Sequence, residues 1–69
     1  MLAHEDRRAI LAALRLLPHR QREVLVLRYY LDLPDAEISA VMGIGPSSVR
    51  SAAHRGLGGL ERLLAGEMS

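Results

Sequence analysis

The sequence predicts a small all-α domain of four helices with a helix-turn-helix, and three observations support this prediction. Apolar residues recur at three- and four-residue steps along most of the chain, which is the period of an amphipathic helix. Proline or glycine interrupts this period at several points, which predicts short connections between the helices. The 69 residues are 49% hydrophobic, which is enough for one small core. We expect one domain over residues 1–69, with helices at about 5–16, 18–31, 34–42 and 46–64.

The first predicted helix carries an apolar stripe and stops at a proline. Ile10, Leu11, Leu14 and Leu17 recur at helical steps, so they are expected to share one face. The residue before a proline avoids the α region, which ends this helix at Leu17. Pro18 then suits the first turn of the second helix, where its missing N–H is not needed.

The second predicted helix has an apolar face and a basic start. Val24, Leu27 and Leu31 are expected to share the apolar face. Arg20 and Arg22 lie near the start, where cations oppose the helix dipole unless an anion is close. These two arginines either contact a phosphate or extend into solvent, and the sequence leaves both alternatives open.

The loop before the third predicted helix is expected to hold two helices together. Leu33 is expected to be buried under this loop, and Pro34 stands where the third helix begins. Arg28 is within reach of Glu37 across the loop. We expect an ion pair between them that joins the second helix to the third.

A helix-turn-helix is predicted around Gly43 and Gly45. Gly43 stands where the third helix must end, and glycine adopts the left-handed cap at no steric cost. Gly45 and Pro46 then suit the N-cap and the first residue of the fourth helix. Ile44 is expected to tuck under the turn, and Val49 to point back at the third helix.

The outward face of the fourth helix is the predicted binding surface. A helix-turn-helix inserts its second helix into the major groove of DNA, and the alternative is a plain helical hairpin in a small all-α domain. The chain has a net charge of +1, but no acidic residue occurs between Glu37 and Glu61, so this helix is basic. All nine basic residues are Arg, which suits bidentate contacts to phosphate and guanine, with a GC-rich genome as the alternative explanation. The residues expected on this face are Ser47, Ser48, Arg50, Ser51 and His54.

Three glycines lie within the fourth predicted helix. Gly56, Gly58 and Gly59 each cost about 0.8–1 kcal/mol relative to alanine in a helix. The sequence leaves open whether the helix is straight, loose or bent at this point. Its apolar face is predicted to consist of Val49, Ala53, Leu57, Leu60 and Leu64.

The composition excludes several classes of protein. The chain has no cysteine, which excludes a disulfide framework and a thiolate zinc site and fits a reducing cytoplasm. No apolar run approaches the roughly 18 residues that a membrane helix needs. The chain lacks a nucleophile elbow, a phosphate loop, paired carboxylates and a metal-ligand cluster, so we expect no catalysis, cofactor or metal. Ser47 and Ser48 lie about two turns from His54, which is too far for a catalytic dyad.

Short motifs in a fixed order extend over about residues 9–64. They are Leu17-Pro18, Gln21-Arg22-Glu23-Val24-Leu25, Leu27-Arg28-Tyr29, Leu33, Ala36-Glu37-Ile38, Gly43-Ile44, Val49-Arg50-Ser51 and His54-Arg55. Together they resemble region 4 of bacterial sigma factors, the C-terminal promoter-binding domain. Arg55-Gly56-Leu57 followed by Leu60 is similar to a variant of the extracytoplasmic-function (ECF) group.

This resemblance implies the C-terminal module of a longer, two-domain transcription initiation factor. Such a module binds the −35 promoter element in the major groove and docks on the flap of the RNA polymerase β subunit. An anti-sigma factor often covers the same surface. We expect a monomeric, cytoplasmic domain with no membrane partner. The DNA-contacting residues that the resemblance implies are Ser47, Ser48, Arg50, Ser51, His54, Arg55, Arg20 and Arg22.

Several positions depart from the family pattern. Pro34 stands where Ser or Thr forms a capping box with the following Glu, and Ser39 replaces a small alanine. Ala52 stands where many members carry Arg or Gln, and Ala53 where many carry a larger apolar residue. Because these two alanines remove a DNA contact and thin the core, we expect the isolated domain to bind DNA weakly.

Two other interpretations stay open. The output domains of the LuxR/GerE type also combine an Arg-Glu-Val-Leu helix with a glycine-containing turn, but they dimerise through a further C-terminal helix. The other alternative is a docking module, bound by an anti-sigma factor or an activator, with weak intrinsic DNA binding. A dimer in solution would favour the first alternative, and protein binding without DNA binding would favour the second.

Overall fold

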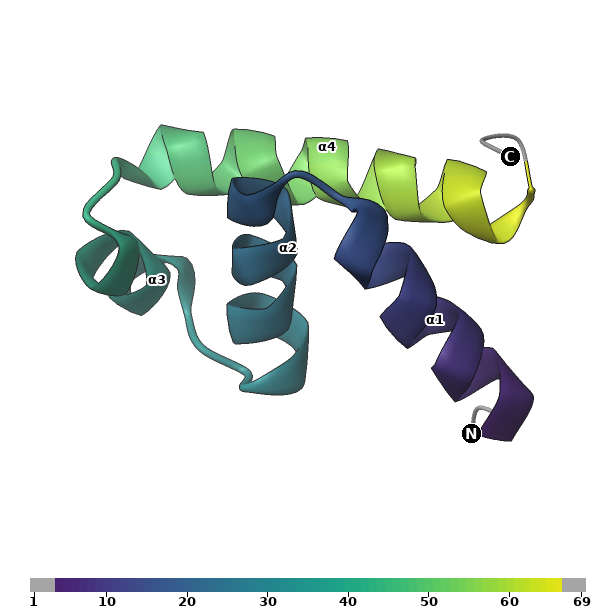
Figure 1. Cartoon of the computed structure of the whole chain (residues 1–69). Coiled ribbons are helices and arrows are strands. Elements are labelled where there is room, and N and C mark those ends of the chain that lie inside the picture. Colours follow the sequence, from purple (N-terminus) through teal and green to yellow (C-terminus); the bar gives the residue numbers. More distant parts are fainter. Residues whose placement is uncertain (1–3, 67–69) are drawn as a thin grey trace.

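The computed structural model describes residues 4–66, and these residues form an all-α domain without a strand (Figure 1). This confirms the predicted fold class and the order of the helices. The predicted bounds match closely, except at the end of the second helix, and residues 1–3 and 67–69 of the predicted domain lie outside the described part. The elements are α1 (His4–Leu16), α2 (His19–Leu25), the π-helical η1 (Val26–Tyr30), α3 (Asp35–Met42) and α4 (Pro46–Leu64).

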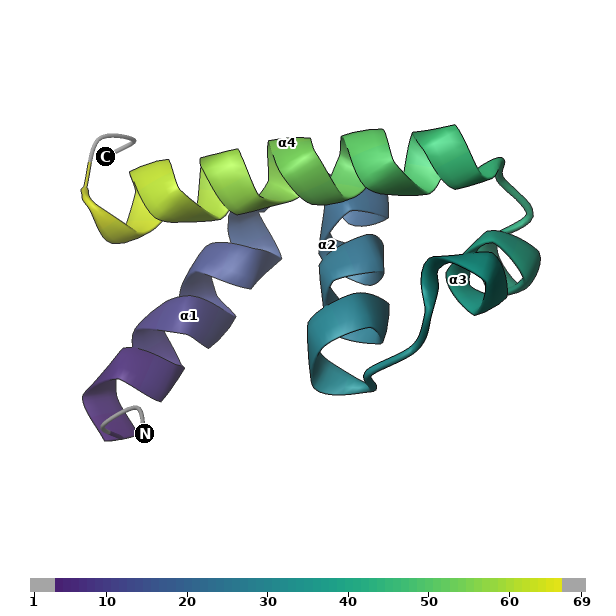
Figure 2. The same cartoon turned by 180° about the vertical axis from the view of Figure 1, so that it is seen from behind.

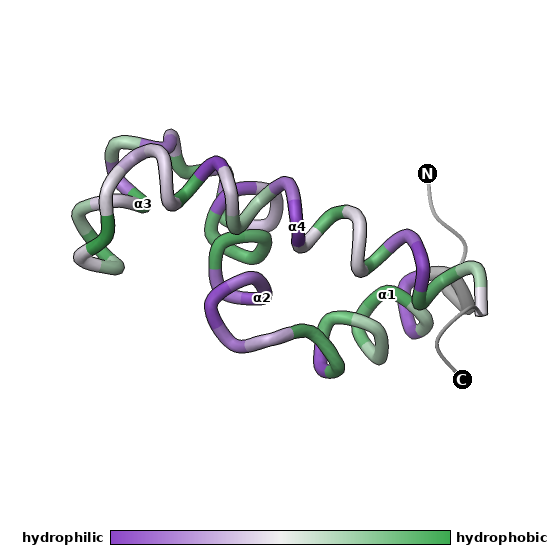
Figure 3. The backbone as a smooth tube through the Cα atoms, turned by 90° about the horizontal axis from the view of Figure 1, so that it is seen from above, coloured by the Kyte–Doolittle hydropathy of each residue, from purple (hydrophilic) through white to green (hydrophobic). Residues whose placement is uncertain are grey.

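The longest helix, α4, is the element against which the others pack. It is continuous over 19 residues, so the segment around Gly56, Gly58 and Gly59 stays helical. α1 and α2 both meet α4 at one end and then diverge from each other, as two opposite views show (Figures 1 and 2). Hydrophilic and apolar residues alternate along α4, as expected for a helix with one face toward the core (Figure 3).

The core lies where α2, α3 and α4 meet. Val24 of α2, Ile38 of α3 and Val49 of α4 are completely buried, and Ala52 and Ala53 of α4 join them in one cluster. Each helix therefore contributes side chains to a single apolar contact, which fixes α3 relative to α4. Four partly buried side chains close the cluster: Leu27, Leu33, Met42 and Ile44.

The turn between α3 and α4 has the predicted conformation. Gly43 is left-handed, with φ 69° and ψ 32°, and the N–H groups of Gly43 and Ile44 both donate to the Ser39 carbonyl, at 2.9 and 3.2 Å. The Ser39 hydroxyl donates to the Ile44 carbonyl. Gly45 is an extended N-cap, and Pro46 is the first residue of α4. The turn is thus closed by hydrogen bonds on the α3 side and by proline stereochemistry on the α4 side.

The second helix ends differently from the prediction. After Leu25 the chain widens into the π-helical η1, and the Leu31 N–H donates to the Val26 carbonyl five residues earlier, at 3.0 Å. The extra residue in this turn rotates Leu31 out of the predicted apolar face, so its side chain is exposed. Asp32 is left-handed, with φ 59°, which stops the helix. Leu33, predicted under the loop, packs against the core instead of Leu31.

The buried face of α4 also differs from the prediction. Leu57 and Leu64 were expected to be covered, but they are 43% and 47% exposed. Gly56 and Gly59 are buried in their place. The helical period of the apolar residues did not reveal this face, because glycine contributes no hydrophobic side chain to the pattern.

α1 contacts α4 through a narrower surface than its predicted stripe. Ala13 and Leu17 are buried and Ile10 and Leu14 are half-buried, whereas Leu11 is exposed. The stripe is therefore correct at its centre and wrong at Leu11. α1 diverges from α2 along its length (Figure 2), and Leu11 is exposed.

The predicted ion pair of Arg28 has a different partner. The Arg28 Nε atom lies 3.5 Å from the Asp35 carboxylate, at the start of α3, and the guanidinium also lies over the Tyr29 ring, 5.7 Å from its centroid. Asp35 is the first residue of α3 and is nearer to the end of η1 than Glu37, which is exposed. The contact still joins the second helix to the third, as expected, but both side chains are about one-third exposed, so it adds little stability.

Replacing Ile38 by alanine is expected to destabilise the domain by about 2–5 kcal/mol, because the side chain is completely buried in the core cluster. Urea and thermal unfolding, followed by circular dichroism, would measure the loss. Val41→Ala is the matched control in the same helix, since Val41 is 65% exposed, and it is expected to change stability by at most about 0.5 kcal/mol. Equal losses for both variants would contradict the assignment of Ile38 to the core.

Candidate nucleic-acid interface

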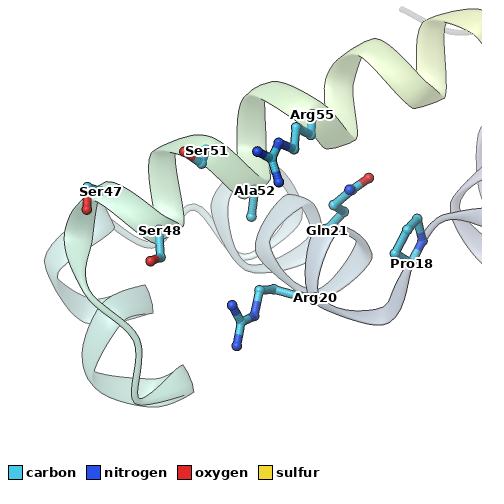
Figure 4. Close-up of a pocket in the computed structure, with 8 residues that line it drawn as sticks. All are labelled: Pro18, Arg20, Gln21, Ser47, Ser48, Ser51, Ala52 and Arg55. Carbon is cyan, nitrogen blue, oxygen red and sulfur yellow. The ribbon is translucent and has the colours of Figure 1, made fainter.

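A groove of about 320 Å³ lies between the start of α2 and the first half of α4 (Figure 4). One wall comes from α2 and the other from α4, which are separated in the sequence by η1 and α3. Five of its eight lining residues belong to the predicted DNA-contacting set, so the fold brings together residues that are distant in the sequence. The groove is lined by Pro18, Arg20, Gln21, Ser47, Ser48, Ser51, Ala52 and Arg55.

Helical spacing explains why α4 presents several of these residues together. Ser47, Ser51 and Arg55 recur at four-residue steps, so they stack along one side of the helix. Ser48 and Ala52 form the neighbouring row, which is closer to α2 and more buried. The core-facing residues of α4 fix the rotation of the helix, and this rotation directs the serine row into the groove (Figure 4).

The groove has the electrostatic character of an anion-binding surface. Arg20 and Arg55 contribute two guanidinium groups, and none of the eight lining residues is acidic. The N-terminus of α4 borders the groove at Ser47 and Ser48, and α4 has no acidic residue in its first turn and no side-chain cap. Backbone N–H groups of a first helical turn lack partners within the helix, and the helix dipole makes that end positive. Arginine and serine side chains add further hydrogen-bond donors, a combination that suits phosphate oxygens.

Three of the predicted residues lie outside this groove. Arg50 and His54 are exposed on α4. His54 borders a second groove, of about 510 Å³, beside Arg55, Arg62 and Leu16. The residues predicted on α4 are thus distributed over its solvent-facing side, and only part of them converges with α2.

Arg22 is the third of these residues, and it is engaged within the protein. Its Nη1 atom donates to the Arg15 carbonyl at 3.3 Å, and its Nη2 atom lies 3.2 Å from His19 Nδ1. The Arg15 carbonyl is one of the last in α1 and has no partner within that helix, so the guanidinium caps the C-terminus of α1. His19 thus lies between two charged side chains, with its Nδ1 atom beside Arg22 and its Nε2 atom 3.6 Å from the Glu23 carboxylate.

Three lining residues were not predicted from the sequence: Pro18, Gln21 and Ala52. Ala52 lies one turn after Ser48 on α4, and Gln21 directly follows Arg20 on α2, so a helical-wheel view of each predicted helix would have suggested them. The sequence pattern of a single helix does not indicate that α2 and α4 converge, because their convergence depends on the angle at which α2 crosses α4.

Two features typical of other protein classes are absent from the described residues. Among the described residues, no group of three or more His, Cys, Asp or Glu side chains is arranged to hold a metal ion. No helix between residues 4 and 66 combines the length and the apolar character needed to cross a bilayer.

Residues 7–58 match the protein family described as sigma-70, region 4. The chain is 35% identical, over 66 residues, to the RNA polymerase sigma-E factor of Streptomyces coelicolor, covering 94% of this chain and 37% of that protein. It is 34% identical, over 61 residues, to the RNA polymerase sigma-E factor of Streptomyces antibioticus, and this match covers 88% of the chain and 34% of that protein. The chain is 45% identical, over 47 residues, to the ECF RNA polymerase sigma factor ShbA of Streptomyces griseus. This match covers 68% of the chain and 25% of that protein.

The chain matches between a quarter and somewhat more than a third of the length of these curated relatives. The family match covers most of α1 and continues through the helix-turn-helix into α4. Sigma factors are transcription initiation factors and not enzymes. The chain belongs to the sigma-70 region 4 family and is a region 4 domain of an ECF-type RNA polymerase sigma factor.

Proposed function

We propose that this domain recognises the −35 element of promoters, with the first half of α4 in the major groove and the start of α2 on the adjacent DNA backbone. The observation that carries the proposal is the groove in which Arg20 of α2 converges with Ser51 and Arg55 of α4. A helix-turn-helix protein contacts bases through its second helix and phosphates through neighbouring elements. The groove supplies the phosphate contacts, and the exposed face of α4 outside the groove supplies a candidate for base contact.

The side chains divide into two roles by position. Arg20 and Arg55 are exposed guanidinium groups in the groove, and we assign them to phosphate contacts, which contribute affinity but no sequence choice. Arg50 is exposed on α4, away from α2, where its fork of donors is free to reach a guanine edge. The backbone N–H groups at the start of α4 and the hydroxyls of Ser47 and Ser48 supply further donors to a phosphate.

The same geometry supports weak binding by the isolated domain. Ala52 lines the groove and is almost fully buried. Its methyl group is too short to reach DNA from this position. The net charge of the chain is only +1, which gives little long-range attraction to a polyanion. We therefore propose that useful promoter binding occurs within the RNA polymerase holoenzyme, and binding by the domain alone is best measured at low salt.

Docking on the β flap of RNA polymerase is the second part of the proposal. Among the residues that the structure describes, eight large hydrophobic side chains are exposed, and a partner protein could cover some of them. Leu11 of α1 and Leu57 of α4 are two of these, and neither lines the basic groove. An anti-sigma factor is a further candidate for this surface, and we propose a monomeric domain that acts in the cytoplasm, where promoters are.

Arg20→Ala and Arg55→Ala are each expected to weaken binding to all duplexes alike and to lower the salt dependence. Each lost phosphate contact reduces the slope of log K against log salt by about 1. Fluorescence anisotropy over a series of salt concentrations measures this slope. Arg8→Ala is the control, because Arg8 is exposed on α1 outside the groove. This substitution removes one positive charge, as the other two do. If all three variants change the slope equally, the groove has no special role.

Arg50→Ala is expected to flatten the preference among −35 sequences by about 1–3 kcal/mol, because a bidentate base contact is lost. The measurement is anisotropy against a panel of duplexes with different −35 elements. Arg62→Ala, near the other end of α4, serves as the control for loss of an exposed arginine. An unchanged ranking of duplexes for Arg50→Ala would remove the assignment of Arg50 to base recognition.

The double variant Leu11→Ser/Leu57→Ser is expected to weaken binding of a β-flap fragment by about tenfold while DNA binding is retained. Because both side chains are exposed, the substitutions are expected to leave the fold intact. Calorimetric titration with the flap fragment measures the effect, and Arg20→Ala/Arg55→Ala provides the reciprocal control. If the flap fragment binds the wild type but no duplex does, the domain is chiefly a protein-docking module.

A further inference from the structure

We propose that Gly56 and Gly59 of α4 form a notch that positions the start of α2, and that this notch sets the distance across the groove between Arg20 and Arg55. In this proposal the two glycines are positioning residues for DNA recognition. They are more than helix-weakening residues that α4 merely tolerates. The consequence for DNA rests on the proposed function, whereas the packing argument does not.

The contact at Gly56 leaves no room for a side chain. A Cβ atom at this position would lie 3.0 Å from Leu25 Cδ1, 3.1 Å from Leu25 Cγ and 3.4 Å from Gln21 Cβ. Two of these atoms, Leu25 Cγ and Gln21 Cβ, lie close to the α2 backbone, so rotation of a side-chain end does not clear the site. A methyl group at residue 56 therefore requires Leu25, and the part of α2 that carries it, to give by a few tenths of an ångström.

Gly59 lies about one turn further along α4 and faces Leu17. A Cβ atom there would lie 2.9 Å from Leu17 Cδ2, the end of a side chain at the junction between α1 and α2, which moves aside more easily than Leu25 Cγ. The two glycines are three residues apart and so lie on the same side of α4. The notch thus faces both Leu25, within α2, and Leu17, which stands before Pro18 and the start of α2.

The notch is directly connected to the groove. Gln21, whose Cβ atom would lie 3.4 Å from a Cβ atom at residue 56, also lines the groove, next to Arg20. On α4, Ala52 precedes Gly56 by one turn and lines the groove as well. Any displacement of α2 at Gly56 is therefore transmitted to the wall that carries Arg20, while Ser51 and Arg55 stay with α4 (Figure 4).

Gly58 provides the contrast within the same helix. Its Cβ atom would meet only Arg62 Nη1, at 3.5 Å, which is an ordinary van der Waals distance. Gly58→Ala and Gly56→Ala therefore add the same atom and the same gain in helix propensity to α4. They differ in whether the added methyl group meets α2.

The test compares the full 69-residue chain and its variants by anisotropy with one −35 duplex at low salt. Gly56→Ala is expected to weaken DNA binding by about fivefold, because the Arg20 side chain leaves its position relative to Arg55. Gly58→Ala is expected to stay within about twofold of the wild type. Circular dichroism is expected to show equal helicity for both variants. Equal DNA affinities for the two variants would overturn the proposal.

A volume-conserving exchange keeps the test valid if Gly56→Ala loses stability. In Gly56→Ala/Leu25→Val the added methyl group on α4 is matched by one fewer carbon on α2. The exchange is expected to recover about half of the lost binding free energy, since valine lacks the δ carbon that lies nearest to the added methyl group. If the double variant binds no better than Gly56→Ala, the loss does not arise from the notch.

Nuclear magnetic resonance separates the notch from the DNA-binding proposal. Amide shifts of Arg20 and Gln21, and the NOEs between the Leu25 methyl groups and α4, report the position of α2 without DNA. Gly56→Ala is expected to change these signals and Gly58→Ala to leave them unchanged. If the wild type binds no duplex but this difference is observed, the promoter-binding proposal fails and the notch stands. If both variants leave α2 unchanged, the notch fails whatever the DNA result.

Discussion

The close contact between α2 and α4 is the constraint on which the rest of the structure depends. The side of α4 that meets α2 consists largely of Ala52, Ala53 and Gly56, so α2 approaches until Val24 and Leu25 fill the space between the helices. A chain without Phe or Trp has few large side chains to span a wider gap. Its Cα positions extend over 33 × 24 × 14 Å, and such a thin domain can exclude water from its core only where the helices lie very close.

Two independent local devices then combine to build one recognition surface. The left-handed Gly43 and the following Pro46 determine where α4 starts and how it is rotated. The contact at Gly56 determines how near α2 comes to that helix. The first device orients the serine row of α4, and the second brings Arg20 beside it. The recognition surface thus depends in part on Gly43 and Gly56, residues to which no contact with a base or a phosphate is assigned.

Much of this architecture could be predicted from the sequence, because helix ends and the turn depend on local chemistry. Gly43, Gly45-Pro46 and the buried Val49 were identified from spacing and backbone preference alone. The π-helical turn at Val26–Tyr30 could not be predicted, since one extra residue per turn leaves the sequence pattern unchanged while it rotates Leu31 outward. The internal role of Arg22 and the convergence of Arg20 with α4 depend on angles between helices, and no periodicity encodes those angles.

The divergence of α1 from α2 leaves α1 outside the core cluster of α2, α3 and α4, as far as the described residues show. Ala13 is the buried residue among the described side chains of α1, Leu17 is buried just after its end, and the guanidinium of Arg22 caps that end. Undocking of α1 would uncover Ala13 and Leu17 but no residue of the core cluster. We therefore expect the amide protons of the first helix to exchange by local opening more readily than those of the helices that form the cluster.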